Sequence, residues 1–203
     1  MNGKSQHYLK LAILGEKQVG KTSLVTRYTL GDFNPHYLYT KAGGDITHKD
    51  LQIQGKPVHV TIIDSAGHKY VRSLIKTLYR DVHGIMLVYD VTRKNTFERL
   101  DDWLREIERV NTSHPLILLV GNKMDLEKYS QVDIDQAEMS AHRHNLGHIQ
   151  CSAKTGLNVV KAFETLLHST VLEKLPNEPN NSIKLKGNNS DGGRKKNSFC
   201  CSI

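Results

Sequence analysis

Eight residues near the start of the chain have the types and spacing of a phosphate-binding loop. Residues 15–22, GEKQVGKT, fit the pattern G-x-x-x-x-G-K-[ST]. They follow an apolar run at 9–14 and lead into a stretch of helical character at 23–30. A strand, a glycine-bounded turn and a helix in this order aim backbone N–H groups at one point, where the helix dipole also favours negative charge. The pattern predicts a nucleoside triphosphate site, the alternative being a glycine turn beside a surface lysine.

The end of this loop indicates how a triphosphate would be held. The ammonium group of Lys21 can reach the β- and γ-phosphates, and the Thr22 hydroxyl is a suitable ligand for Mg²⁺. Asp64, after the apolar run 58–63, is a second candidate Mg²⁺ ligand, although an aspartate at a strand end is also an ordinary capping residue. The residues expected to contact the nucleotide here are Gln18, Val19, Gly20, Lys21, Thr22 and Ser23.

A second motif selects the base. Asn122, Lys123 and Asp125 form an N-K-x-D tetrapeptide after the apolar run 116–120 and Gly121. Aspartate can accept hydrogen bonds from both N1–H and the exocyclic amine of guanine, a donor pair that adenine lacks. The tetrapeptide alone is a common accident, but its place after a strand and downstream of a phosphate loop favours guanine.

A short segment later in the chain completes the predicted base site. Ser152, Ala153 and Lys154 follow the last apolar run, and their backbone N–H groups could meet the O6 atom of guanine.

Apolar runs and helical spacings alternate along the chain. This alternation predicts a parallel sheet covered on both faces, with its ligand at the carboxyl ends of the strands. A hairpin is expected at 51–60, with its turn at 54–57, so one edge strand should be antiparallel. The apolar runs lie at 9–14, 58–63, 84–89, 116–120 and 148–151, and the clearest helical spacings at 97–110 and at 159–174, where Leu172 is expected on the apolar face.

Size and charge narrow the class of protein. The 203 residues suffice for one sizeable core, and no apolar stretch approaches the roughly 18 residues of a membrane span. The net charge is +7, and residues 176–203 alone carry five basic and two acidic side chains. Nucleic-acid-binding proteins usually concentrate charge on the fold, whereas a basic tail suits an anionic membrane. We expect a domain at 1–175, a disordered tail at 176–203 and no nucleic-acid partner; a merely solvated tail is the alternative.

Together the motifs resemble those of the Ras-like small GTPases. Residues 64–67, 122–125 and 152–154 follow the phosphate loop in the order of that superfamily, and residues 87–92 and the two cysteines near the end are most similar to the Rab branch. The resemblance implies an α/β P-loop GTPase domain with a mixed, mostly parallel six-stranded sheet and helices on both faces.

The resemblance also implies a GTP/GDP cycle with Mg²⁺, in which two segments order around the γ-phosphate and effectors recognise them. By family position, Thr40 is a Mg²⁺ ligand, the N–H of Gly67 senses the γ-phosphate, and His68 begins the second segment. Such a switch would regulate vesicle trafficking at the cytoplasmic face of an intracellular membrane, with a cytosolic pool. The implied partners are an exchange factor, a GTPase-activating protein, effectors and a prenyl-binding chaperone.

The residues beside the predicted γ-phosphate depart from the family pattern. His68 replaces the glutamine that orients the attacking water, which suggests slow intrinsic hydrolysis unless the histidine serves adequately. Two glycines, Gly43 and Gly44, follow Thr40 and raise the entropy cost of ordering that loop.

Two further positions differ from the family. Gln18 stands where many relatives have a small residue, and it would either crowd the γ-phosphate or face solvent. Ile63 replaces the tryptophan of Rab proteins, leaving Tyr79 as the remnant of an aromatic cluster that effectors recognise.

The end of the chain resembles a lipidation signal of the family. Cys200 and Cys201, behind a basic tail, resemble the prenylation sites of Rab proteins, and the ending also fits the C-a-a-X form loosely. The alternative is an exposed pair of thiols.

Three histidines and one cysteine are expected to have no role in ligand binding. His142, His144 and His148 are expected to be solvated rather than to bind metal, and Cys151 to be a buried thiol. Two competing functions remain: a GTP-binding interaction module with little or no hydrolysis, favoured by His68, and a P-loop ATPase or kinase, opposed by Asn122 and Asp125.

Overall fold

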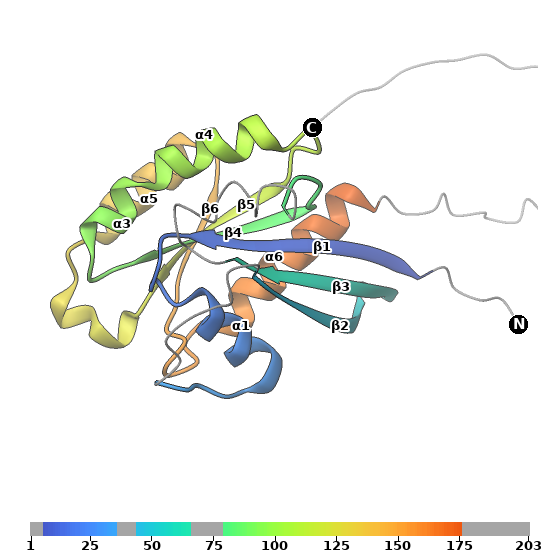
Figure 1. Cartoon of the computed structure of the whole chain (residues 1–203), viewed down its shortest axis with the longest axis horizontal. Helices are drawn as coiled ribbons and strands as arrows, with labels where there is room; N and C mark the ends of the chain where they lie inside the picture. Colours follow the sequence, from blue (N-terminus) through green and yellow to red (C-terminus); the bar gives the residue numbers. More distant parts are fainter. Residues whose placement is uncertain (1–5, 36–43, 66–78, 176–203) are drawn as a thin grey trace, which may run out of the picture.

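The computed structural model describes residues 6–35, 44–65 and 79–175, which build one mixed sheet with helices on both faces (Figure 1). The sheet has the order β2-β3-β1-β4-β5-β6, and only β2 runs antiparallel to its neighbour. The predicted fold class is therefore confirmed. The strands are β1 (His7–Gly15), β2 (Asp45–Ile53), β3 (Lys56–Asp64), β4 (Gly84–Asp90), β5 (Leu116–Asn122) and β6 (Gly147–Gln150).

The helices divide between the two faces of the sheet. Helices α1 (Lys21–Leu30) and α6 (Val159–Lys174) cover one face, while α3 (Lys94–Glu98), α4 (Leu100–Val110) and α5 (Ile134–Arg143) lie over the other (Figure 1). A 3₁₀ helix, η1 (Met124–Tyr129), follows β5.

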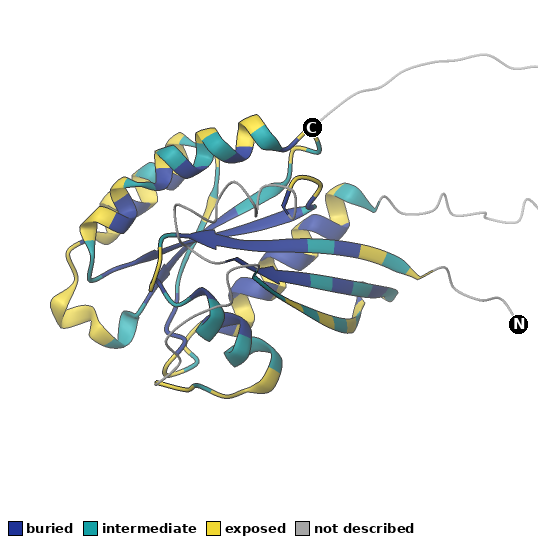
Figure 2. Cartoon of the chain, in the orientation of Figure 1, coloured by how far each residue is buried: buried dark blue, intermediate teal, exposed yellow. Residues whose placement is uncertain are grey.

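The alternating directions of the side chains along β1 show why helices must cover both faces of the sheet. Leu11 and Ile13 belong to the core under α1 and α6, whereas Ala12 and Leu14 belong to the core under α4 and α5. Because successive side chains of a strand point to opposite faces, a strand that is apolar at every position must be covered twice. The centre of the sheet is accordingly buried along β1 and β4, while β2 alternates between partly buried and exposed residues (Figure 2).

Three local predictions need correction. The hairpin turn is two residues long, because Gln54 (φ 52°) and Gly55 (φ 73°) are both left-handed, as a tight hairpin requires, and residues 56–57 already belong to β3. The helix expected at 97–110 is two helices, α3 and α4, which meet at Arg99. In α6, Leu172 is exposed and Val171 is buried instead.

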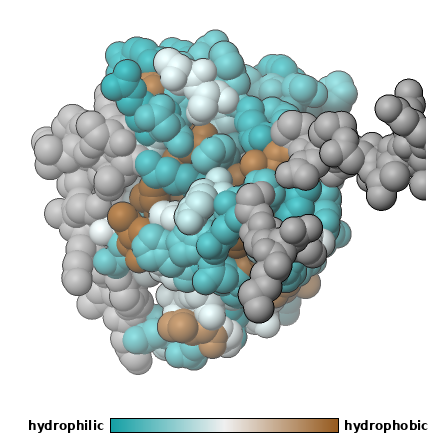
Figure 3. Space-filling view, turned by 90° about the vertical axis from the view of Figure 1, so that its right-hand side faces the viewer, coloured by the Kyte–Doolittle hydropathy of each residue, from teal (hydrophilic) through white to brown (hydrophobic). Residues whose placement is uncertain are grey.

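The described surface is mostly hydrophilic at the end of the molecule that carries the β2–β3 turn. On the face shown in Figure 3, hydrophobic residues of the described chain form small areas separated by hydrophilic ones.

Two partly buried histidines make the stability of the fold depend on pH. The Nδ1 atom of His83 accepts a hydrogen bond from the backbone N–H of Lys10 at 3.0 Å, and His148 is hydrogen-bonded to the hydroxyl of Tyr89 at 3.0 Å. Burial lowers the pKa of both imidazoles below the usual 6.5, and Lys174 lowers the pKa of His83 further. Since the unfolded chain binds these protons more readily, stability is full above the unfolded pKa and is lost as the pH falls below it.

We therefore predict that the urea midpoint falls between about pH 7.5 and about pH 5.5, and that His83→Asn reduces this fall. Asparagine can still accept the Lys10 N–H but does not titrate. The measurement is urea unfolding followed by circular dichroism, with the exposed His142→Asn as the control. An identical pH dependence in His83→Asn and the unsubstituted protein would contradict the assignment.

Candidate functional site

The phosphate loop joins the carboxyl end of β1 to the start of α1, at the centre of the sheet. Lys21 is only 5% exposed, and its Nζ atom donates to the carbonyl oxygens of Gly15 (3.0 Å) and Glu16 (2.9 Å). The loop thus curls around the ammonium group. A buried ammonium is expensive unless its protons are paired, so these two carbonyls fix where the positive charge lies.

Two glycines of the loop stand where no side chain fits. A Cβ atom at Gly15 would lie 2.2 Å from the carbonyl oxygen of Val88, and one at Gly20 would lie 2.2 Å from Nδ2 of Asn122. Both residues also have positive φ, at 138° and 94°. Gln18 adopts a left-handed conformation too (φ 62°), but its side chain is exposed, which favours the second of the two alternatives expected for it.

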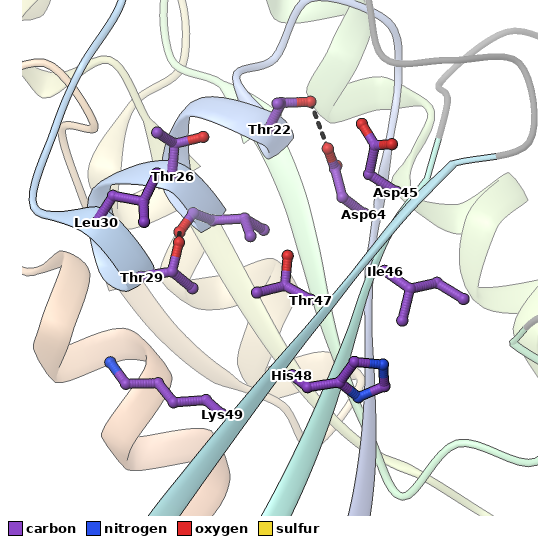
Figure 4. Close-up of a pocket in the computed structure, with 11 residues that line it drawn as sticks. Thr22, Thr26, Thr29, Leu30, Asp45, Ile46, Thr47, His48, Lys49 and Asp64 are labelled. Atoms are coloured by element: carbon purple, nitrogen blue, oxygen red, sulfur yellow. Dashed lines mark hydrogen bonds between the residues drawn. The ribbon is translucent and has the colours of Figure 1, made fainter.

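Thr22 and Asp64 meet beside the loop. The Thr22 hydroxyl donates to Oδ2 of Asp64 at 2.5 Å, and the two side chains point toward each other with Asp45 next to them (Figure 4). Asp64 is 2% exposed. All three contribute to a cavity of about 520 Å³ between α1 and β2, and every polar group they offer is an oxygen. Hard cations such as Mg²⁺ take oxygen ligands, so this set fits the implied metal.

Asn122 occupies a position that its motif alone did not reveal. Its side chain is buried; Nδ2 donates to the carbonyl of Val19 at 2.8 Å, and Oδ1 accepts the backbone N–H of Ala153 at 3.1 Å. Asn122 therefore ties the phosphate loop to the segment 152–154. Both of its polar atoms are engaged by protein, so its contribution is to position two loops.

Asp125 lies beside the same segment. Its Oδ1 atom accepts a hydrogen bond from the Ser152 hydroxyl at 2.7 Å, and its Oδ2 atom is 3.8 Å from Nζ of Lys154. One carboxylate oxygen is thus oriented by Ser152, which is fully buried. The structure brings together all the predicted residues of the phosphate loop and of the two base segments that it describes.

Asp90 is a buried acid that the motif analysis missed. It ends β4 with no exposed surface, and its Oδ2 atom contacts Nζ of Lys123 (2.7 Å) and Nε of Arg93 (2.9 Å). Burial raises the pKa of Asp90, but hydrogen bonds from Lys123 and Thr92 outweigh it, so the pKa lies below its usual value. The sequence signal that could have identified Asp90 is an acidic residue directly after a buried strand, as at Asp64.

Arg27 of α1 is a second missed residue. Its guanidinium group donates to the carbonyls of Ala153 (2.9 Å), Lys154 (2.7 Å) and Gly31 (2.7 Å). It thereby holds the predicted base segment against the helix that follows the phosphate loop. Nothing in a lone arginine within a helical stretch marks such a role.

Several predicted residues are elsewhere or outside the described chain. Tyr79 is 1% exposed and donates to Glu106 at 2.8 Å, so it is part of the core rather than of a surface that effectors could recognise. The predictions for Thr40, Gly67 and His68 and for the C-terminal Cys200 and Cys201 fall outside the described residues.

The remaining cysteine and the histidines named above have defined surroundings in the structure. Cys151 is buried, and burial raises its pKa to about 12, as expected for a structural thiol. His144 pairs with Asp101, but the expectation that His148 is solvated is wrong, because its ring is partly buried and hydrogen-bonded to Tyr89. The described residues contain no cluster of three side chains suited to a metal. Within the same residues, no helix is long and apolar enough to cross a membrane.

Comparison with known proteins agrees with this geometry. A model of the Ras family matches residues 10–172. The chain is 34% identical over 197 residues to Ras-related protein Rab-13 of Rattus norvegicus, with 97% of each chain covered. It is 36% identical over 187 residues to Rab-1 of Theileria parva (90% of this chain, 84% of the relative) and 39% identical over 164 residues to Rab-18 of Lymnaea stagnalis (80% of each). The chain therefore belongs to the Ras family of small GTPases, and within it to the Rab branch.

Proposed function

We propose that this Rab-like GTPase binds GTP and GDP at the loop 15–22 and acts as a membrane-recruited switch in vesicle trafficking. The observation that carries the site is the buried Lys21 ammonium, held by the carbonyls of Gly15 and Glu16 while Asn122 joins the same loop to Ala153. These hydrogen bonds hold the phosphate loop next to the base segment 152–154. The phosphates would contact Gln18, Val19, Gly20, Lys21, Thr22 and Ser23.

Guanine would be recognised by Asp125 and the segment 152–154. Ser152 holds one carboxylate oxygen of Asp125, which orients the group for N1–H and the exocyclic amine. The guanidinium group of Arg27 donates to the carbonyls of Ala153 and Lys154. It therefore restrains the backbone whose N–H groups would meet guanine O6.

Mg²⁺ would be held by Thr22 and Asp64, and by Thr40, which lies outside the described residues. When bound, the ion would neutralise charge on the β- and γ-phosphates.

Hydrolysis depends on groups of the chain that meet the phosphates. Lys21 and the N–H groups at the start of α1 would stabilise the negative charge that develops as the γ-phosphoryl group leaves. His68 would orient the attacking water in place of glutamine, which gives slow intrinsic turnover. The non-hydrolysing alternative is not favoured, because members of the Ras family are GTPases.

Recruitment would use the segment 176–203. Prenylation at Cys200 and Cys201, helped by the basic side chains of this segment, would anchor the protein, and an exchange factor, an activating protein, effectors and a prenyl-binding chaperone would control the cycle. This part of the proposal rests on the sequence and on the family.

Asp125→Asn should change the base preference. Asparagine cannot accept both donors of guanine, whereas its amide can donate to the C2 carbonyl of xanthine and accept from N1–H. We expect GDP affinity to fall roughly 100-fold and xanthosine diphosphate to bind better than GDP. Fluorescent-nucleotide titration measures both, with exposed Glu127→Gln as the control. Unchanged GDP affinity would refute the guanine assignment.

His68→Gln should accelerate single-turnover GTP hydrolysis by at least about tenfold, because glutamine presents an acceptor and a donor on a flexible stem. GDP affinity, measured in parallel, should stay the same because the change concerns the water. Equal hydrolysis rates in His68→Gln and the unsubstituted protein would contradict the hypothesis that His68 limits turnover.

Replacing both Cys200 and Cys201 by serine should move the protein from membranes to the soluble fraction, and the single replacements should separate one lipid from two. Mass spectrometry of the protein from its native cells reports the modification itself, with Ser198→Ala as the control for tail changes. An unmodified C-terminus in those cells would rule out lipid anchoring.

A further inference from the structure

Arg93 reaches from the start of α3 to the backbone of the phosphate loop. Its Nη2 atom donates to the carbonyl oxygen of Lys17 at 2.9 Å, and its Nε atom contacts Asp90 Oδ2 at 2.9 Å. One guanidinium group thus bridges the end of β4 to the middle of the loop. The planar fork of arginine suits such a bridge, because two of its N–H groups point in fixed directions.

The contact fixes the orientation of one peptide group of the phosphate loop. The bond between Lys17 and Gln18 is a planar trans amide, so the Gln18 N–H points away from the Lys17 carbonyl. Holding that carbonyl on the outer side of the loop directs the Gln18 N–H to the inner side. Gln18 is left-handed (φ 62°), a conformation that is unfavourable for a non-glycine residue and is stabilised here by surrounding contacts.

Thr96 and Asp90, which hold Arg93 in place, are buried and hydrogen-bonded. The Thr96 hydroxyl donates to the Arg93 carbonyl at 2.7 Å and accepts the Asp90 N–H at 3.0 Å, and Thr96 is buried. Asp90 is fully buried and shares its Oδ2 atom between Arg93 and Lys123. A buried carboxylate between two cations resists displacement, because moving either cation leaves charge uncompensated.

We propose that Arg93 is a positioning residue that holds the phosphate loop in its nucleotide-binding form, and that Asp90 links this restraint to Lys123 of the guanine motif. The inference rests on the proposed nucleotide site. It assigns Arg93 and Asp90 no contact with the nucleotide itself. Their effect passes through the Lys17 carbonyl, and therefore concerns ligands that carry a β-phosphate.

The test measures dissociation of fluorescent GDP and the affinity for GMP in the full chain. Arg93→Gln should release GDP roughly 3- to 10-fold faster, as loss of a charge-assisted hydrogen bond predicts, with little change in GMP affinity. Arg93→Lys should release GDP nearly as fast as Arg93→Gln, because lysine lacks the planar fork with which Arg93 donates to Asp90 and Lys17 in two fixed directions. The preference for GDP over inosine diphosphate should stay constant in both.

Arg105→Gln is the matched control. Arg105 also pairs with an aspartate three residues away, Asp102, at 2.7 Å, but it lies on α4 and the described contacts do not link it to the loop. Unchanged GDP release in both Arg93 variants would overturn the proposal, and so would full restoration by lysine or an equal loss of GMP affinity. If the unsubstituted chain fails to retain GDP, the proposed nucleotide site itself is wrong, which is a separate result.

Discussion

The buried side chain of Asn122 joins the two halves of the candidate site, and the other contacts depend on it. Its amide donates to Val19 in the phosphate loop and accepts from Ala153 in the base segment. Gly20 has no Cβ because that atom would collide with this amide. A single residue at the end of β5 therefore sets the distance between the place where phosphates would lie and the place where a base would lie.

The buried charges near this amide each have hydrogen-bonding or ionic partners. The Lys21 ammonium is matched by carbonyls of its own loop, and Asp90 by Lys123 and Arg93. Burying a charge without such partners would cost several kcal/mol. These charges can exist in the core only when β1, β4 and β5 end at the same edge of the sheet, so the sheet order is a condition for the site.

Sequence patterns predicted the strands and the main helices well, because apolar period and strand length are local properties. They failed where local choices compete. The sequence pattern of residues 97–110 predicts one helix, yet α3 ends before Arg99 and α4 begins after it. Tyr79 was assigned to a recognition surface, but its ring lies in the core under α4 and its hydroxyl contacts Glu106. An aromatic residue satisfies either environment, and only the packing selects one.

The amino-acid sequence by itself determined the ligand class and the fold, because the glycine-bounded loop, the N-K-x-D tetrapeptide and the apolar alternation are short-range signals with physical meaning. Only the tertiary structure decided what Asn122, Arg27, Asp90 and Arg93 do. Arg27 bonds to Lys154 across 127 positions of the chain, Asn122 to Val19 across 103 and Arg93 to Lys17 across 76, and Asp90 pairs with Lys123 of another strand end. A side chain's hydrogen-bond partner across such separations follows from which strand ends are adjacent, and no local pattern encodes that.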